Sequence, residues 1–236
     1  GQAYMATGDS SLARESFERA VALQPGLVEA SVALATMESR SGQAQYARGR
    51  LKAILNAHPD HRQAMEVLFT LDLAAGDWSH AASMLNRLRQ LEGDTAATLM
   101  AEGKLYESRK DLSRAIATYE HAASMAVDAQ GPLVAVVQLD LQNKQPERAR
   151  RRLENILAAH PDHLYAHGLM GEVLTLIGRR DAAMAHFREA TRINPRWITP
   201  WLDAATLSIA QGQAGDAVRT LREGLTANPA SEELHM

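Results

Sequence analysis

The chain has 236 residues, of which 46% are hydrophobic and 22% are charged, a composition typical of a folded globular protein. The formal net charge of -3 argues against nucleic acid as a partner, because broad affinity for phosphates needs a surplus of Lys and Arg. Cysteine is absent, which excludes disulfides, thiolate catalysis and cysteine-ligated zinc. No apolar run reaches the roughly 18 to 20 residues that span a bilayer, so we expect no insertion into a membrane.

Alanine recurs every 34 residues and marks one face of a repeated helix. Four residues after each alanine stands a large apolar residue, and side chains at this spacing lie on the same face of a helix. The stripe continues three residues further on, so each repeat is predicted to contain an amphipathic helix. The alanines are Ala13, Ala47, Ala81, Ala115, Ala149, Ala183 and Ala217, and the large apolar residues are Phe17, Leu51, Leu85, Tyr119, Leu153, Phe187 and Leu221.

Turn-forming residues flank each of these helices. Glycine stands five residues before most of the alanines, where it permits the left-handed backbone that ends a preceding helix. Proline follows most of the helices and cannot stay in a helix interior. Each unit is therefore predicted to be a helix, a tight turn, a second helix and a proline-bearing turn. The exceptions are Lys110 and Lys144 in the glycine column and Gly93 and Val127 in the proline column.

This ladder of alanine, large apolar residue and proline on a 34-residue unit resembles the tetratricopeptide repeat (TPR) family. The resemblance implies an all-α fold, a right-handed superhelical solenoid of antiparallel helix pairs that spans residues 1–236 as a single array. Counting predicts a partial repeat at 1–27, full repeats at 28–61, 62–95, 96–129, 130–163, 164–197 and 198–231, and the start of a truncated repeat at 232–236.

The incomplete first unit and the short tail suggest a fragment of a longer array. Terminal repeats normally carry a polar outer face, so cut ends would expose apolar surface and favour homo-association through the array ends. We therefore expect a sedimentation coefficient that rises with protein concentration. A strictly monomeric species at high concentration would contradict this expectation.

The resemblance also predicts where a ligand binds. In TPR-like arrays the first helices of successive repeats line a concave groove, and the resemblance implies a non-catalytic scaffold that holds a peptide or helix of another protein there. Some TPR proteins clamp an acidic C-terminal tail with several convergent cations, but here Lys104 stands alone, so we expect no such clamp. Some groove positions, such as Val32, could instead pack between adjacent first helices. The candidate partner-binding residues are Thr36, Glu66, Thr70, Met100, Lys104, Gln138, Tyr165, Glu172 and Thr206.

A short histidine motif occurs twice in the chain. The segment at residues 58–61 reads His-Pro-Asp-His and recurs at 160–163, and His163 and His167 lie four residues apart. Two histidines and an aspartate are possible metal ligands, but a helix turn capped by Asp60 or Asp162 explains the motif more simply. We predict no metal site. Asp9, Asp77 and Asp111 are likewise predicted to cap second helices.

No enzyme chemistry is evident in the sequence. It contains no phosphate loop, no nucleophile elbow and no pair of carboxylates in a distinct environment, so we predict no catalytic residue and no cofactor. Trp197 and Trp201 either stack on a ligand or pack between repeats. From residue 144 to 196 there are ten Lys or Arg against six Asp or Glu, which indicates either a solvated outer surface or a site for an acidic partner or anionic polysaccharide.

Two further functions stay open at the level of sequence. One is a substrate-positioning arm of a larger bacterial enzyme or of a polysaccharide or protein export assembly, and the other is a self-assembling array. The alanine- and arginine-rich repeats resemble those of bacterial TPR proteins, including proteins of exopolysaccharide and PEP-CTERM surface-sorting systems. This resemblance implies an envelope or periplasmic location rather than a cytoplasmic one.

Overall fold

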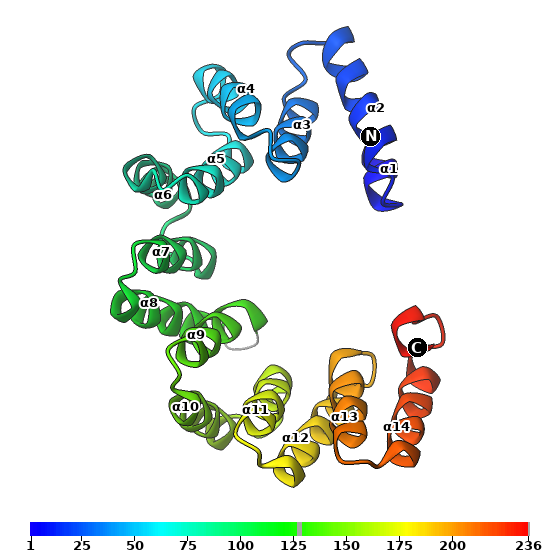
Figure 1. Ribbon diagram of the computed structural model, residues 1–236. Coiled ribbons are helices and arrows are strands. Elements are labelled where there is room, and N and C mark those ends of the chain that lie inside the picture. Colours follow the sequence, from blue (N-terminus) through cyan, green and yellow to red (C-terminus); the bar gives the residue numbers. More distant parts are fainter. Residues whose placement is uncertain (127–128, 236) are drawn as a thin grey trace. The chain divides into compact units, whose positions relative to one another are not determined.

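The computed structural model describes residues 1–126 and 129–235, and in this part of the chain it contains fourteen α-helices, one 3-10 helix and no strand (Figure 1). The predicted all-α fold class is therefore confirmed. The chain divides into two compact units, Gly1–Thr118 and Tyr119–Met236, and the boundary falls within α8.

The first unit contains α1 (Gln2–Ala6), α2 (Ser10–Leu23), α3 (Val28–Arg40), α4 (Ala44–Ala57), α5 (Arg62–Ala74), α6 (Trp78–Glu92), α7 (Ala96–Ser108) and the start of α8 (Leu112–Met125). The second contains the rest of α8, α9 (Gln130–Gln142), α10 (Pro146–Ala159), α11 (Leu164–Leu176), α12 (Arg180–Ile193), α13 (Thr199–Ala210), α14 (Ala214–Ala227) and the 3-10 helix η1 (Glu232–His235).

Helical hairpins form two layers within each unit. In the first unit α3 packs on α4 and α5 on α6, while α3 also contacts α5. In the second unit α11 packs on α12 and α13 on α14, while α11 contacts both α9 and α13. The first helices (α3, α5, α7, α9, α11 and α13) thus form one layer in their unit, and the second helices (α2, α4, α6, α8, α10, α12 and α14) form the other.

The repeated alanines lie where these layers meet. Six of the seven are fully buried, and Ala217 is 2% exposed. A methyl side chain lets two helices approach closely, and the large residue one turn later fills the space beside the contact. Tyr119 and Phe187, for example, are 1% and 2% exposed. The amphipathic second helices predicted from the alanine ladder are therefore present.

The tight turns between first and second helices share one conformation. Each has its glycine-column residue at positive φ, including Lys110 at 62° and Lys144 at 56°. The next residue's N–H closes the turn on a carbonyl of the first helix, as Asp111 does to Tyr106 and Gln145 to Asp140, both at 2.9 Å. This is the Schellman arrangement of a helix C-terminus. The two lysines therefore keep the turn geometry of glycine in spite of the substitution.

We expect Lys110→Gly and Lys144→Gly each to raise the free energy of unfolding by about 0.5–1 kcal/mol. A left-handed backbone costs a side-chain-bearing residue about 1–2 kcal/mol, and the greater freedom of glycine in the unfolded chain offsets part of that gain. Urea denaturation followed by far-UV circular dichroism measures the change. Lys52→Gly, at an exposed position inside α4, is the control and should lose about 1 kcal/mol.

The proline-bearing turns also follow one pattern. Pro25, Pro59, Pro161, Pro195 and Pro229 each stand two residues after the last residue of a second helix. Gly93 replaces proline by acting itself as the C-cap of α6, at a φ of 72°. Val127 lies outside the described residues.

The predicted caps of the second helices are confirmed. The carboxylates of Asp9, Asp77 and Asp111 accept hydrogen bonds from the backbone N–H groups of the residues three positions later, at 3.2–3.3 Å. Each bond satisfies one of the amide donors that a helix N-terminus leaves unpaired.

The predicted caps of the first helices α5 and α11 were wrong. His61 and His163 cap these helices, not Asp60 and Asp162, because the turn after the proline places the fourth residue of the motif at the N-cap. In each case the imidazole Nδ1 accepts the N–H of the residue three positions later at 3.2 Å. The two copies of the His-Pro-Asp-His motif are thus equivalent capping turns.

A second histidine contact joins α11, α12 and the turn before α11. His167 Nε2 lies 2.7 Å from the carbonyl oxygen of Pro161, and His167 Nδ1 lies 2.9 Å from His186 Nδ1. Because a carbonyl only accepts, His167 carries its proton on Nε2, and its Nδ1 accepts from His186. Burial lowers the pKa of His186, and the neighbouring His167 lowers it further.

This lowered pKa predicts a loss of stability in mild acid. The unfolded chain protonates His186 near its ordinary pKa of about 6.5, whereas the folded chain resists protonation. The unfolded state then binds more protons, so the free energy of unfolding should fall as the pH drops through this value and level off below the lowered pKa. We expect His186→Asn, which keeps a donor but does not titrate, to reduce that slope in urea denaturation between neutral and mildly acidic pH. An unchanged slope would contradict the assignment.

Candidate functional site

A groove on the first-helix layer of the first unit brings together four of the nine predicted residues. It has a volume of about 230 Å³ and lies between α5 and α7, with α6 behind them. Glu66 and Thr70 on α5 face Met100 and Lys104 on α7, each pair being one repeat apart. The floor is apolar and includes Phe69, Leu73, Leu88 and Ala101. We call this the first-helix groove.

The charges around the first-helix groove are unevenly distributed. Arg62 bridges Glu66 and Glu92 at one end, with N–O distances of 2.8 and 2.6 Å. Lys104 is exposed, and no described residue pairs with it. The Thr70 hydroxyl donates to the Glu66 carbonyl at 3.0 Å, so it offers a ligand only an acceptor. The groove thus offers an apolar floor, one free cation, and an acidic end where one arginine is shared by two carboxylates.

The remaining five predicted residues are not lining residues of this groove. Thr36 lies on α3, and its hydroxyl donates to the Val32 carbonyl at 2.9 Å. Val32 itself is fully buried, so packing is the correct interpretation of that position. Gln138, Glu172 and Thr206 are exposed on first helices of the second unit.

Tyr165 belongs to an aromatic contact of the second unit. Its ring meets Trp197 edge to face, with centroids 5.3 Å apart. Trp197 lies directly over Gly168, and Trp201 lies against Gly224 while its Nε1 donates to the Pro195 carbonyl at 3.0 Å. Trp197 therefore packs on α11 of its own repeat, whereas Trp201 packs on α14 of its own repeat and hydrogen-bonds to the turn of the preceding one.

Glu172 has an acidic neighbour that the sequence did not reveal. Desolvation raises the pKa of Glu172, and the Asp203 carboxylate on α13 raises it further, although the Glu172 side chain opens to solvent. Burial also raises the pKa of Asp203. The repeat pattern did not single out Asp203, because the equivalent positions of the preceding repeats are occupied by Ala101, Ala135 and Leu169. The sequence analysis also missed Arg62 and Glu92. Arg62 could have been found from its spacing of four residues from Glu66, which predicts an ion pair on one helix face.

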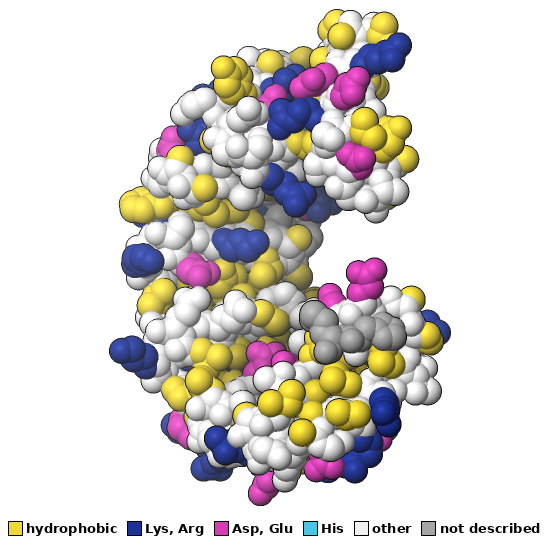
Figure 2. Space-filling view, turned by 45° about the vertical axis from the view of Figure 1, so that its right-hand side comes forward, with side chains coloured by type: hydrophobic (Ala, Val, Ile, Leu, Met, Phe, Trp, Pro, Cys, Tyr) yellow, Lys and Arg dark blue, Asp and Glu magenta, His cyan; other side chains and the backbone are white. Residues whose placement is uncertain are grey.

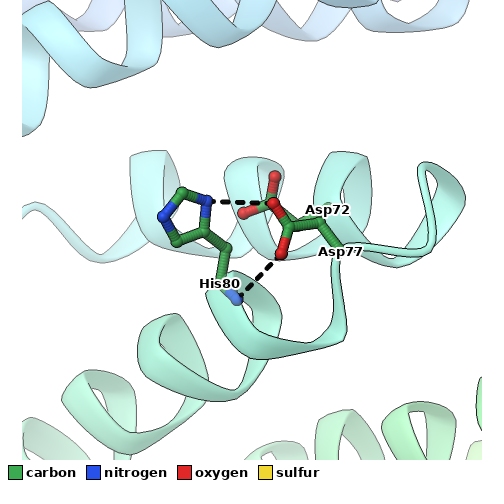
Figure 3. Close-up of side chains that lie close together, drawn as sticks. All are labelled: Asp72, Asp77 and His80. Atoms are coloured by element: carbon green, nitrogen blue, oxygen red, sulfur yellow. Dashed lines mark hydrogen bonds and ion pairs between the residues drawn. The ribbon is translucent and has the colours of Figure 1, made fainter.

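One group of three side chains in the described part of the chain offers closely spaced metal-ligand atoms, namely Asp72, Asp77 and His80 (Figure 3). These atoms already have partners. Arg48 lies 2.6 Å from the Asp72 carboxylate, and Asp77 accepts the N–H of His80 while its other oxygen lies 3.1 Å from the His80 imidazole. Burial raises the pKa of Asp72 against the opposing Arg48 charge, while the His80 N–H lowers that of Asp77. We therefore explain the cluster as a helix cap joined to an inter-repeat ion pair.

The surface carries charges of both signs. On the face that Figure 2 presents, Lys and Arg side chains lie interspersed with acidic and apolar ones. None of the described helices is both long and apolar enough to span a bilayer. Stacked helical hairpins with a side-chain-lined groove define a class of repeat protein that presents surfaces to other molecules.

Comparison with known families identifies that class. Tetratricopeptide repeat models match residues 1–26, 67–132 and 140–202. The chain belongs to the tetratricopeptide repeat family, as its repeat ladder predicted. This fold is in general a scaffold for protein–protein interaction and is typically non-catalytic.

Two curated relatives share the name cellulose synthase operon protein C. The protein of Pseudomonas fluorescens (strain SBW25) is 25% identical over 229 residues, and that of Xanthomonas axonopodis pv. citri (strain 306) is 28% identical over 246 residues. The matches cover 92% and 94% of this chain but only 17% and 16% of those proteins. The chain therefore spans about one sixth of their length.

Solved structures support the fold. A tetratricopeptide repeat protein from Parabacteroides merdae matches with a TM-score of 0.57 at 16% identity, over 99% of this chain and 93% of that one. PilW, a type IV pilus biogenesis factor, matches with a TM-score of 0.52 at 17% identity, over 89% and 97% of the two chains. At these identities the likeness shows the fold alone.

Proposed function

We propose that this chain is a non-catalytic scaffold whose first-helix groove binds a peptide or helix of a partner protein. The observation that carries this proposal is the meeting of Glu66, Thr70, Met100 and Lys104 around an apolar floor. A volume of about 230 Å³ accommodates one or two apolar side chains. Such a groove suits recognition of apolar anchors on a partner segment, with Lys104 free to meet a carboxylate or carbonyl.

The test is affinity capture from the cells in which the chain occurs, followed by a direct binding measurement with the captured protein. We expect Met100→Glu with Lys104→Glu to lose a partner that the unmodified chain retains, because the two changes put a negative charge beside the apolar floor and reverse the free cation. Gln142→Glu, at an exposed first-helix position of the second unit that is not among the nine candidates, is the matched control. Equal capture by all three proteins would contradict the proposal.

The relatives favour a second candidate function, that of a substrate-positioning arm in a larger bacterial polysaccharide or protein export assembly. The observation that supports this second function is the name that two relatives share, cellulose synthase operon protein C. A cello-oligosaccharide titrated into the chain tests the polysaccharide form of this idea by calorimetry. A saturable heat of binding would favour the substrate-positioning arm. No heat of binding, together with a protein partner whose capture depends on the first-helix groove, would favour the scaffold.

A further inference from the structure

A long groove runs along the second-helix layer of the second unit, between α8 and α10. It consists of two adjoining cavities of about 650 and 410 Å³, which share Glu120, Arg152 and Asn155. We call their union the outer groove. It has no residue in common with the first-helix groove.

The two halves of the outer groove differ in chemistry. The larger half surrounds the start of α10 and is lined by four cations, Lys144, Arg148, Arg151 and Arg152, against Glu120 and Glu147. The smaller half is mostly apolar and includes Ala123, Leu133, Val136, Ile156 and Ala159. A basic half thus continues directly into an apolar half.

Two of the four cations are free for a ligand. Arg152 is held by Glu120 and by Asp140, the latter at 3.1 Å, and Arg148 lies 3.4 Å from Asp140. Lys144 and Arg151 form no ion pair with a carboxylate among the described residues. Arg151 donates to the Glu147 carbonyl at 3.4 Å, and its charge adds only a minor contribution to the lowered pKa of Glu147, whose main partner is Arg150.

The first unit contains a matching groove without these cations. Between α2 and α4 lies a cavity of about 450 Å³ whose lining residues correspond to those of the outer groove three repeats later. Arg50 and Ile54 take the places of Arg152 and Ile156. However, Gly42, Tyr46 and Gly49 stand where the outer groove has Lys144, Arg148 and Arg151. The basic half is therefore a property of one repeat and not of the fold.

We propose that the outer groove binds a partner peptide segment that combines several acidic residues with adjacent apolar side chains. The free cations of the basic half complement the acidic residues. The apolar half takes up the apolar side chains and excludes water from around them. An anionic polysaccharide supplies charge but no apolar side chains, so it would leave the second half empty.

The test is fluorescence anisotropy with a short fluorescein-labelled peptide that carries a run of Asp and Glu followed by Leu and Phe. We expect saturable binding at one site per chain that weakens as salt is raised. The variant Lys144→Gly with Arg151→Gln should bind about tenfold more weakly, which corresponds to ~1.4 kcal/mol. Because glycine suits the left-handed turn at residue 144, this variant is expected to fold at least as well as the unmodified chain.

Two further variants test each half of the outer groove. Ala159→Glu puts a charge in the apolar half and should also weaken binding, whereas Arg222→Gln, an exposed change on α14, should leave it unchanged. Tyr46→Arg with Gly49→Arg grafts cations onto the matching groove of the first unit and should raise the stoichiometry to two peptides per chain.

Several outcomes would overturn the proposal. The first is no saturable binding of the peptide, and the second is unchanged affinity in the Lys144 and Arg151 variant. An equal loss in Arg222→Gln would indicate nonspecific attraction between charges. Binding of alginate as tight as that of the peptide, or no effect of Ala159→Glu, would show that the apolar half contributes nothing. None of these results bears on the first-helix groove, so the two proposals fail independently.

Discussion

Asp140→Ala is expected to lower the free energy of unfolding by about 3 kcal/mol, because it removes the buried carboxylate beside the partly buried Arg152 guanidinium and leaves Arg152 only the exposed Glu120. Asp140 is completely buried at the end of α9. Its carboxylate lies 3.1 Å from Arg152 and 3.4 Å from Arg148, and Arg152 is itself only 14% exposed. Glu38 and Arg50 form the equivalent ion pair in the first unit, with an N–O distance of 2.8 Å.

The control for this prediction is Asp162→Ala. Asp162 also pairs with an arginine, Arg192, at 2.8 Å, but their side chains are 78% and 60% exposed. Exposed pairs contribute little, so the expected loss is below about 1 kcal/mol. Urea denaturation followed by far-UV circular dichroism compares the two variants. Equal losses would mean that burial does not decide the strength of the Asp140 contact.

Gly171→Ala is expected to destabilise the second unit by about 1–3 kcal/mol, although the same change inside a helix ordinarily stabilises. A Cβ atom at residue 171 would lie 2.3 Å from the Phe187 ring. Phe187 is 2% exposed and packed in the core, so its ring has no room to move aside. The contact joins α11 to α12 within one hairpin.

Two other glycines test this interpretation in the same denaturation experiment. At Gly168 an added Cβ would lie 2.4 Å from Trp197, but that indole is partly exposed, so it can shift and the loss should be smaller. At Gly49, inside α4, nothing lies within 4 Å, and alanine should add about 0.5–1 kcal/mol of stability. A gain in stability for Gly171→Ala would show that the core adapts to the extra methyl group.

Part of the candidate site followed from the repeat alone. Glu66 and Met100 are 34 residues apart, as are Thr70 and Lys104, and equal positions in neighbouring repeats lie beside each other when first helices stack. Glu92 could not be predicted from the repeat, because its ion pair with Arg62 depends on where α6 places the Glu92 side chain. Asp203 did not follow either, since small or apolar residues occupy its column in the preceding repeats.

The sequence by itself determined the helices, the left-handed turns and the aspartate caps of the second helices, because these depend on spacing within a few residues along the chain. It predicted the α-helical hairpins, and even the lysines at residues 110 and 144 adopt the glycine conformation. Only the tertiary structure decided that His61 and His163 cap their helices, that Asp140 is buried beside Arg152, and that a basic and an apolar cavity adjoin along α10. The physical reason is that the histidine caps depend on local turn geometry and side-chain rotamers, while the other two features depend on distances between helices, and no periodicity encodes either.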